Sequence, residues 1–329
     1  MPRANVPRLD EEEMLPKVRA LIGKVVKKNL VEGLLFSGGL DTSVIAVEAS
    51  KHRKITAITI CFKQGEAKDL TYAKKLTDFL KLNHIIHFFD VKELFESLND
   101  VISILKTFDP MEVRNSVPVY IGLKLAKEKN LDGVMTGDGL DELFLGYPWL
   151  FNLTEDELKK RLLRMWKEMR FSSIPLGEVL KINVKTPFLD PEFAEFAKKV
   201  DIKHKLNIKD GKKYGKWLIR RAYEGIIPEE ILWREKIPLE IGTGTTVLPK
   251  FFEREISDNY YEERRQFYLT HDNVKLTSKE QLFYYEIFRK NCGKPADVFK
   301  TPRGKQCPYC KAFLERETSF CRVCGAYPI

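Results

Sequence analysis

The sequence lacks any apolar run of the ~18 residues that a membrane span needs. Its first segment, 1–13, is polar and then acidic, which is unlike a secretory signal. No lysine follows the paired glycines Gly38 and Gly39, so these residues do not form a Walker A loop. Outside the last 23 residues the only cysteines are Cys61 and Cys292, which we interpret as a buried strand residue and a linker thiol. We therefore expect a cytoplasmic protein with no membrane partner.

The 329 residues, of which 43% are hydrophobic and 31% charged, have the composition of an ordinary globular protein. This length allows one large α/β domain with an elaborated end, or two domains. The formal net charge of +9 favours polyanionic partners such as nucleotides or RNA. Charge alone does not distinguish between these partners.

The stretch 31–43, VEGLLFSGGLDTS, predicts a strand, a glycine turn and the start of a helix. Backbone N–H groups at a helix N-terminus have no intrahelical partners, and glycines let a phosphate approach them. A plain capped turn would use the same residue types. The complete S-G-G-x-D-x-S string favours phosphate binding, and it resembles the PP-loop of ATP pyrophosphatases. Asp41 would repel a bare phosphate, so we interpret it as a ligand of an accompanying magnesium ion.

Short buried strands alternate with helices along the first part of the chain. The predicted strands are 31–36, 55–62, 84–89 and 133–136, and the predicted helices include 11–30, 70–82, 91–105 and 111–129. This alternation predicts an α/β fold with a doubly wound parallel sheet. Ligands of such sheets bind beyond the carboxyl ends of the strands, so the glycine loop and the segment after the fourth strand should share one edge.

The segment after the fourth strand, TGDGLDELFLGY at 136–147, places Asp138, Asp141 and Glu142 at that edge. Clustered carboxylates repel one another unless a cation lies between them. An acidic turn that caps a helix would also explain these residues. Because Asp41 independently suggests a metal, we predict a magnesium ion shared by Asp41 and Asp141.

Farther along, 149–180 is expected to be helical and 184–193 to be an extended, proline-flanked turn that leads into a helix. Residues 212–222 are expected to form a helix with Lys213, Lys216 and Arg220 on one face. The second half of 231–244 is rich in proline and glycine and predicts a mobile loop. A loop without a Walker lysine needs cations from elsewhere to bind pyrophosphate. Lys236 and Arg220 are the candidates.

Several ordered motifs between about residues 15 and 250 resemble the synthetase domain of asparagine synthetases, which β-lactam synthetases share. The motifs are SGGLDTS at 37–43, VRNSVPVY at 113–120, TGDGLDELFLGY at 136–147, TPFLDPEFAEFA at 186–197, KWLIRRAYEG at 216–225 and PEEILWREK at 228–236. The resemblance implies an adenine nucleotide alpha hydrolase-like fold. It also implies an ATP-dependent ligase that adenylates a carboxylate, aspartate in the family type, and transfers it to an amine.

The resemblance also implies roles for individual residues. Asp41 and Asp141 match magnesium ligands, Lys236 matches the lysine that stabilises the leaving group, and Asp138 takes the place of a glutamate that deprotonates the attacking nitrogen. The matches to positions that hold ATP or pyrophosphate are Ser37, Gly38, Gly39, Asp41, Thr42, Ser43, Ile60 and Gly137. Asp138 is one methylene shorter than glutamate, so the resemblance leaves the acceptor and the nucleophile open.

A second departure is that the sequence reaches the synthetase motifs almost at its start, without the family's amidotransferase half. We therefore expect the nitrogen to come from free ammonia, from a separate glutaminase subunit or from another amine. The expected cofactors are ATP and Mg²⁺.

Four cysteines close the chain, in a C-x2-C, ten-residue, C-x2-C pattern: Cys307, Cys310, Cys321 and Cys324. Closely spaced thiolate pairs that surround one ion are typical of structural zinc ribbons. Two disulfides would use the same residues, and the absence of an export signal argues against them. An iron centre with the same ligands stays open. We expect an ATP pyrophosphatase domain at 1–290, a linker at 291–306 and a zinc ribbon at 307–329.

A zinc ribbon beside a PP-loop domain is also similar to certain tRNA-modifying enzymes, in which a tRNA base is adenylated and the ribbon docks RNA. The thiolating members need additional reactive cysteines in the catalytic domain, and Cys61 is the only candidate here. A nucleotide-sensing or scaffold protein is a third interpretation. Asp41, Asp141 and Lys236 argue against it, because the resemblance gives these residues metal-binding and catalytic roles.

Overall fold

A computed structural model describes residues 10–301, 304–314 and 318–329. The remaining positions lie outside the described residues, so the predicted linker and zinc ribbon are described in part. The main sheet has five strands, all of them parallel, in the order β3-β2-β1-β4-β5. They are β1 (Gly33–Leu35), β2 (Thr56–Phe62), β3 (Asn83–Phe89), β4 (Val134–Met135) and β5 (Val184–Lys185). Within the described residues no helix combines the length and apolar character of a membrane span.

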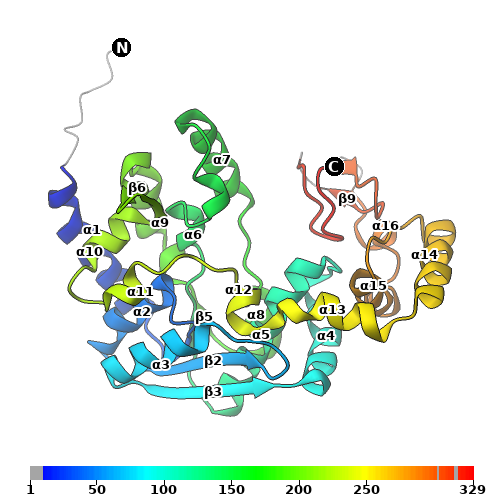
Figure 1. The fold of residues 1–329 in the computed structure, drawn as a ribbon, viewed down its shortest axis with the longest axis horizontal. Coiled ribbons are helices and arrows are strands. Elements are labelled where there is room, and N and C mark those ends of the chain that lie inside the picture. Colours follow the sequence, from blue (N-terminus) through cyan, green and yellow to red (C-terminus); the bar gives the residue numbers. More distant parts are fainter. Residues whose placement is uncertain (1–9, 302–303, 315–317) are drawn as a thin grey trace.

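Helices cover both faces of this sheet (Figure 1), which confirms the predicted doubly wound α/β fold. One face carries α1 (Glu11–Lys28), α2 (Leu40–Ser50) and α3 (Asp69–Leu80), and the other carries α4 (Val91–Leu105), α5 (Pro110–Glu128) and α8 (Ser173–Leu180). Side chains of neighbouring residues in a strand alternate between the faces. Leu34 and Ala57 accordingly join the first core, and Leu35 and Ile58 join the second.

The direction in which successive strands are added to the sheet reverses at β1. From β1 the strands proceed outward through β2 to β3, and the chain then returns to place β4 on the opposite side of β1. Gly33 pairs with both Thr56 and Val134. Such a reversal leaves a crevice at the carboxyl ends of the two strands, where ligands of open α/β sheets bind.

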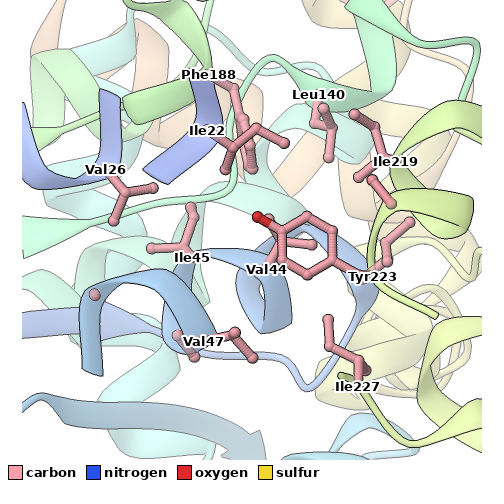
Figure 2. Close-up of a cluster of buried hydrophobic side chains, with 14 of the residues drawn as sticks. Ile22, Val26, Val44, Ile45, Val47, Leu140, Phe188, Ile219, Tyr223 and Ile227 are labelled. Atoms are coloured by element: carbon pink, nitrogen blue, oxygen red, sulfur yellow. The ribbon is translucent and has the colours of Figure 1, made fainter. Parts of the chain in front are cut away.

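The core between α1 and α2 also fixes the later helix α10 (Trp217–Ala222). Ile22, Val26, Val44 and Ile45 pack there with Ile219 and Tyr223, as Figure 2 shows. The Tyr223 hydroxyl donates to Glu48 Oε1 at 2.9 Å, so this buried phenol is satisfied. The contact holds the end of α10 against the last turn of α2.

The predicted helix over 212–222 is wrong in its first half. Strands β6 (Leu206–Lys209) and β7 (Lys212–Gly215) form an antiparallel hairpin, and α10 begins after it. Asp210 and Gly211 form the turn, with φ of 50° and 77°, and an Asp-Gly pair favours this geometry. Lys213, Lys216 and Arg220 therefore do not share a helix face. Lys213 points instead to the Phe151 carbonyl, at 2.8 Å.

Three further expectations need correction. Strand β5 lies within the segment expected to be an extended turn, and its two residues are too few to show a pattern. Helix α12 (Leu239–Thr243) lies within the expected loop, where Glu240 pairs with Arg114 at 2.9 Å. The expected linker contains the end of α15 (Lys279–Asn291) and all of α16 (Pro295–Val298). Apolar contacts override the proline and glycine content in these segments.

The remaining elements surround the sheet. They are α6 (Leu140–Leu143), α7 (Glu155–Glu168), α9 (Pro191–Lys199), α11 (Glu229–Leu232), α13 (Leu248–Glu255), α14 (Asp258–Asp272), β8 (Lys305–Gln306) and β9 (Phe313–Leu314), with 3-10 turns at Pro148–Leu150, Pro187–Leu189, Ile202–His204 and Thr245–Val247. Strands β8 and β9 pair antiparallel on either side of Cys307 and Cys310, and this part of the chain lies beside α15 and α16 (Figure 1).

Candidate active site

A cavity of about 400 Å³ opens at the carboxyl ends of β1 and β4, where the sheet order reverses. The glycine loop and the segment 136–142 form one side of it. Segments 216–220 and 234–243 form a second side, and residues of α5 together with 170–173 form a third. This volume is within the range of small-molecule sites. Most of the predicted site residues therefore meet in one place.

The glycine loop presents a helix N-terminus to the cavity. Gly39 precedes α2 without a side-chain cap, so the first N–H groups of the helix are not satisfied in that way. Ser37 Oγ lies 3.2 Å from Thr42 Oγ1 and accepts from the Gly39 N–H at 3.2 Å. Ser37, Gly39, Asp41 and Thr42 line the cavity. This arrangement can bind an anion through backbone and hydroxyl donors.

Two residues of the loop lie away from the cavity. Gly38 has φ of 67°, and a Cβ there would lie 2.3 Å from the backbone nitrogen of Ala73, so glycine permits close packing on α3. Ser43 is fully buried, and its Oγ has no hydrogen-bond partner among the described residues. Ile60 and Gly137, the positions predicted to frame adenine, both line the cavity.

Two carboxylates and two lysines meet beside the loop. Lys216 Nζ lies 2.6 Å from Asp41 Oδ1 and 2.6 Å from Asp141 Oδ1. Lys236 Nζ lies 2.9 Å from Asp141 Oδ2. The Lys216 side chain is only 3% exposed, whereas that of Lys236 is 35% exposed. Lys216 is therefore enclosed between the carboxylates, and Lys236 approaches them from the open side.

The charges of these groups shift their pKa values in different directions. Burial acts to raise the pKa of Asp141, but Lys216 and Lys236 outweigh it and hold the pKa well below its usual value. For Asp41 burial prevails and raises the pKa, with a further contribution from Asp141. Burial acts to lower the pKa of Lys236, but Asp141 and Asp41 raise it overall. Asp141 and Lys236 therefore both stay charged at neutral pH.

The donor set fits a magnesium ion, because Asp41 and Asp141 both present carboxylate oxygens to the cavity. The sequence indicated both carboxylates. It did not single out Lys216, because the expected helix placed this residue on a solvent-exposed face. In the structure Lys216 has a left-handed conformation, with φ of 58°, at the junction of the hairpin and α10.

Asp138 is held by two hydroxyl groups. Its Oδ2 accepts from Thr136 Oγ1 at 2.7 Å and from Ser173 Oγ at 2.5 Å. Burial raises the pKa of Asp138, and the two hydrogen bonds oppose this rise. The carboxylate lines the cavity with one oxygen already engaged, so the other can accept a proton.

Arg220 reaches the cavity wall, but its guanidinium is used largely by the backbone. Its Nε donates to the Gly215 carbonyl at 3.0 Å, and its Nη1 donates to the carbonyls of Leu232 and Arg234. Burial lowers the pKa of Arg220 to about 10, so it stays charged. Arg220 thus fixes the segment that leads to Lys236.

The structure adds cavity residues that the sequence did not indicate. Arg234 Nη2 donates to Asp69 Oδ1 at 2.7 Å, and its guanidinium stacks 3.9 Å from the centre of the Tyr72 ring. Glu112 and Asn115 of α5 also line the cavity, together with residues 170–173. We call this group of residues the acceptor end. For the pair of Arg234 and Asp69, the one local signal in the sequence is the arginine of the WREK motif, since planar guanidinium groups bind carboxylates well.

The asparagine synthase family matches residues 17–175 and 178–308, which is most of the sequence. The chain belongs to the asparagine synthase family. This finding confirms the resemblance predicted from the motifs, and it supports the enzyme class, an ATP-dependent ligase. Only Cys307 of the four clustered cysteines lies within the match.

Similar proteins include a probable glutamine-hydrolyzing asparagine synthetase of Dictyostelium discoideum. It is 29% identical over 311 residues, which cover 84% of this chain and 55% of the relative. The glutamine-hydrolyzing asparagine synthetase of Rattus norvegicus is 29% identical over 317 residues, covering 88% of this chain and 55% of the relative. The chain thus spans about half the length of these relatives.

Among solved structures, the NMN synthetase of Francisella tularensis is similar with a TM-score of 0.39 and 15% identity, covering 90% of this chain and 99% of its own. The NH3-dependent NAD synthetase of Campylobacter jejuni has a TM-score of 0.36 and 14% identity, covering 91% of this chain and 100% of its own. These similarities are weak, so the family assignment depends on the sequence match.

The four clustered cysteines form a compact, buried group. Their sulfur atoms all lie within 4.8 Å of one another, and the Cys307–Cys324 and Cys310–Cys321 pairs are each 3.7 Å apart. A disulfide bond is about 2.05 Å long. Ligands about 2.3 Å from a tetrahedral zinc ion would lie about 3.8 Å from each other. The spacing therefore fits four thiolates around one metal ion.

Proposed function

We propose that the chain is a cytoplasmic ATP-dependent ligase that adenylates a carboxylate, releases pyrophosphate and transfers the acyl group to ammonia or another amine. The main support is the group of Asp41, Asp141, Lys216 and Lys236 beside the N-terminus of α2. An uncapped helix end and two lysines supply positive charge for a triphosphate. Family membership supports the same reaction class.

In the proposed first step, a carboxylate oxygen attacks the α-phosphorus of ATP and the bond to the bridging oxygen of the β-phosphate breaks. Negative charge then develops on the departing pyrophosphate. Backbone N–H groups after Gly39 and the hydroxyls of Ser37 and Thr42 would bind this anion. Lys236, which approaches from the open side, would stabilise the leaving group. Arg220 contributes by holding the Lys236 segment.

Asp41 and Asp141 are the residues that would hold Mg²⁺. Bound there, the ion would neutralise phosphate charge. The oxygens of both carboxylates pair with Lys216 and Lys236 in the structure, so the two ammonium groups would have to move away from these oxygens for the ion to bind there.

In the second step, the nitrogen nucleophile attacks the acyl carbon, AMP leaves, and Asp138 accepts the proton that the nitrogen loses. The hydrogen bonds from Thr136 and Ser173 keep this carboxylate oriented. The proposed acceptor is aspartate, because the similar proteins are asparagine synthetases and amidation of aspartate gives asparagine. The proposed nitrogen source is ammonia, either free or delivered by a separate glutaminase subunit.

Product analysis tests this function. The chain is incubated with ATP, Mg²⁺, aspartate and an ammonium salt, and the nucleotide products are separated. We expect AMP and pyrophosphate that depend on aspartate, with asparagine formed in equal amount. Formation of ADP would contradict the assignment. A parallel reaction with tRNA in place of aspartate tests the RNA-modifying alternative.

We also propose that Cys307, Cys310, Cys321 and Cys324 bind one structural zinc ion. All four are thiolates in a buried cluster, which leaves no open position for a substrate. Elemental analysis should find one zinc per chain in the native protein and none in Cys310→Ser. The matched control Cys292→Ser, which changes a cysteine outside the cluster, should keep the metal. Iron in place of zinc would reassign the site to a rubredoxin type.

A further inference from the structure

The cysteine-containing end of the chain packs against the start of α5. We call its described part, 305–314 and 318–329, the cysteine knuckle. Thr107 Oγ1 donates to the Arg322 carbonyl at 2.8 Å, and the Phe108 N–H donates to the Val323 carbonyl at 2.8 Å. Gln281 of α15 donates to the Cys324 carbonyl at 2.7 Å. The knuckle thus shares a buried core with α4, α5 and α15.

This contact fixes a residue that begins α5. Asp109 caps the helix by accepting from the Met111 N–H at 3.0 Å. Gly325 of the knuckle has φ of 78°, and a Cβ there would lie 2.5 Å from Asp109 Oδ1. Glu112 and Asn115, which line the acceptor end, follow within the next two turns of the same helix. The position of the knuckle therefore bears directly on one wall of the cavity.

The knuckle also contacts a second wall. The Arg322 guanidinium donates from Nη2 to the carbonyl of Glu168, the last residue of α7. Residues 170–173, which follow closely, also line the cavity and include Ser173, the residue that donates to Asp138. Arg322 therefore links the knuckle to the segment that orients the proposed general base.

The charge of Arg322 also acts on a carboxylate at the acceptor end. Desolvation of the carboxyl group by the surrounding protein raises the pKa of Glu112, and the charge of Asp109 raises it further. The charge of Arg322 acts to lower this pKa. The guanidinium thus lies near the carboxylate of one wall while it donates to the backbone of the other. Asn115 also lines the cavity, and its Oδ1 has no hydrogen-bond partner among the described residues.

We propose that Arg322 is a positioning residue of the active site, which sets the distance between the two walls of the acceptor end and so determines acceptor affinity. The cysteine knuckle then acts as a part of the substrate site and not as a separate docking module. This inference rests on the proposed function only where it predicts the KM for the acceptor. Its prediction for the two wall segments can be measured without enzyme activity.

The structural test is hydrogen–deuterium exchange on the full, metal-loaded chain. In Arg322→Ala, amides in 110–116 and 168–174 should exchange faster, while those in 37–46 around the glycine loop should keep their protection. Arg265→Ala removes a surface arginine that pairs with Glu262, and it should change neither segment. Unchanged exchange in both wall segments of Arg322→Ala would overturn the proposal.

The kinetic test separates positioning from general damage. In Arg322→Ala the KM for aspartate should rise about tenfold, the loss expected for one charged hydrogen bond, with the KM for ATP and kcat within about twofold. Arg322→Lys, which keeps the charge, should recover part of the aspartate affinity. Equal losses for ATP and aspartate would count against a role in acceptor binding. If the native chain releases no pyrophosphate with aspartate, the proposed function fails, and the exchange experiment still decides the role of Arg322.

A second substitution disturbs the α5 wall and leaves the Arg322 side chain in place. Gly325→Ala would press a methyl group on Asp109, whereas Gly211→Ala imposes the same kind of backbone strain, with φ of 77°, in open space. Gly325→Ala should increase exchange at 110–116 and raise the KM for aspartate, with zinc content unchanged, and Gly211→Ala should do neither. Loss of zinc from Gly325→Ala accompanied by normal kinetics would show that the knuckle does not influence the acceptor end.

Discussion

The two ends of the cavity differ in how their polar groups are satisfied. At the phosphate end, the charges of Asp41 and Asp141 are matched by Lys216 and Lys236 at 2.6 to 2.9 Å. At the acceptor end, Asn115 Oδ1 is buried and has no hydrogen-bond partner among the described residues. Buried polar atoms are nearly always paired, so an unpaired one at a cavity wall indicates a ligand contact.

The two ends also differ in their origin along the chain. Short motifs form most of the phosphate end: the glycine loop at 37–43, the acidic segment at 136–142 and Lys236. The acceptor end combines α5 with 170–173, and the far C-terminal knuckle contacts both. Phosphate recognition uses backbone groups and charge, which a short motif can supply. Acceptor recognition depends on spacing between distant segments.

The largest expected effect tests the phosphate end. Lys236→Met should lower kcat by about 10² to 10³, because a cation beside the leaving group is lost while most contacts to ATP remain. Pyrophosphate release at saturating ATP and aspartate measures it. Lys212→Met is the matched control, since Lys212 is 67% exposed and does not line the cavity. An equal rate for Lys236→Met and Lys212→Met would remove Lys236 from the mechanism.

A smaller effect is expected at the acceptor end. Asn115→Leu should raise the KM for aspartate about tenfold and leave the KM for ATP unchanged, because one hydrogen bond to the acceptor is lost. Initial rates at varied aspartate and fixed ATP give this value. Asn99→Leu changes an exposed asparagine of α4 and should leave both constants as they are. If Asn115→Leu affected ATP instead, the assignment of the two ends would be reversed.

The difference in origin explains what the sequence could predict. The fold class, the positions of the first four strands along the chain and the cavity-lining residues Asp41, Asp138, Asp141 and Lys236 follow from local patterns. The hairpin before α10 was missed, although Asp210 and Gly211 carry its turn signal, because the lysines at 212–216 fit a helix equally well. Lys216 was lost as a site residue for the same reason.

The acceptor end had no comparable signal. Glu112 and Asn115 lie on a helix whose sequence shows only which residues are buried, and their role depends on what the rest of the chain places opposite them. The cysteines indicated a metal site, but nothing in their spacing showed that the surrounding residues would reach Asp109 and Glu168. Contacts between segments so far apart in sequence are fixed by the complete core.

The smallest expected effect concerns the residue between the two ends, Asp138. Burial raises its pKa, and the hydrogen bonds from Ser173 and Thr136 favour the charged form and lower the pKa. Ser173→Ala removes one of these donors, so the pKa of Asp138 should rise further. A general base must be deprotonated, so the acid limb of the kcat profile should move to higher pH by the same amount. Ser172 is next in sequence and also lines the cavity, but the hydroxyls that donate to Asp138 are those of Thr136 and Ser173. Ser172→Ala should therefore leave the pH profile of kcat unchanged. An acid limb that does not move in Ser173→Ala would mean that another group accepts the proton, and Asp138 would then serve only to orient the acceptor.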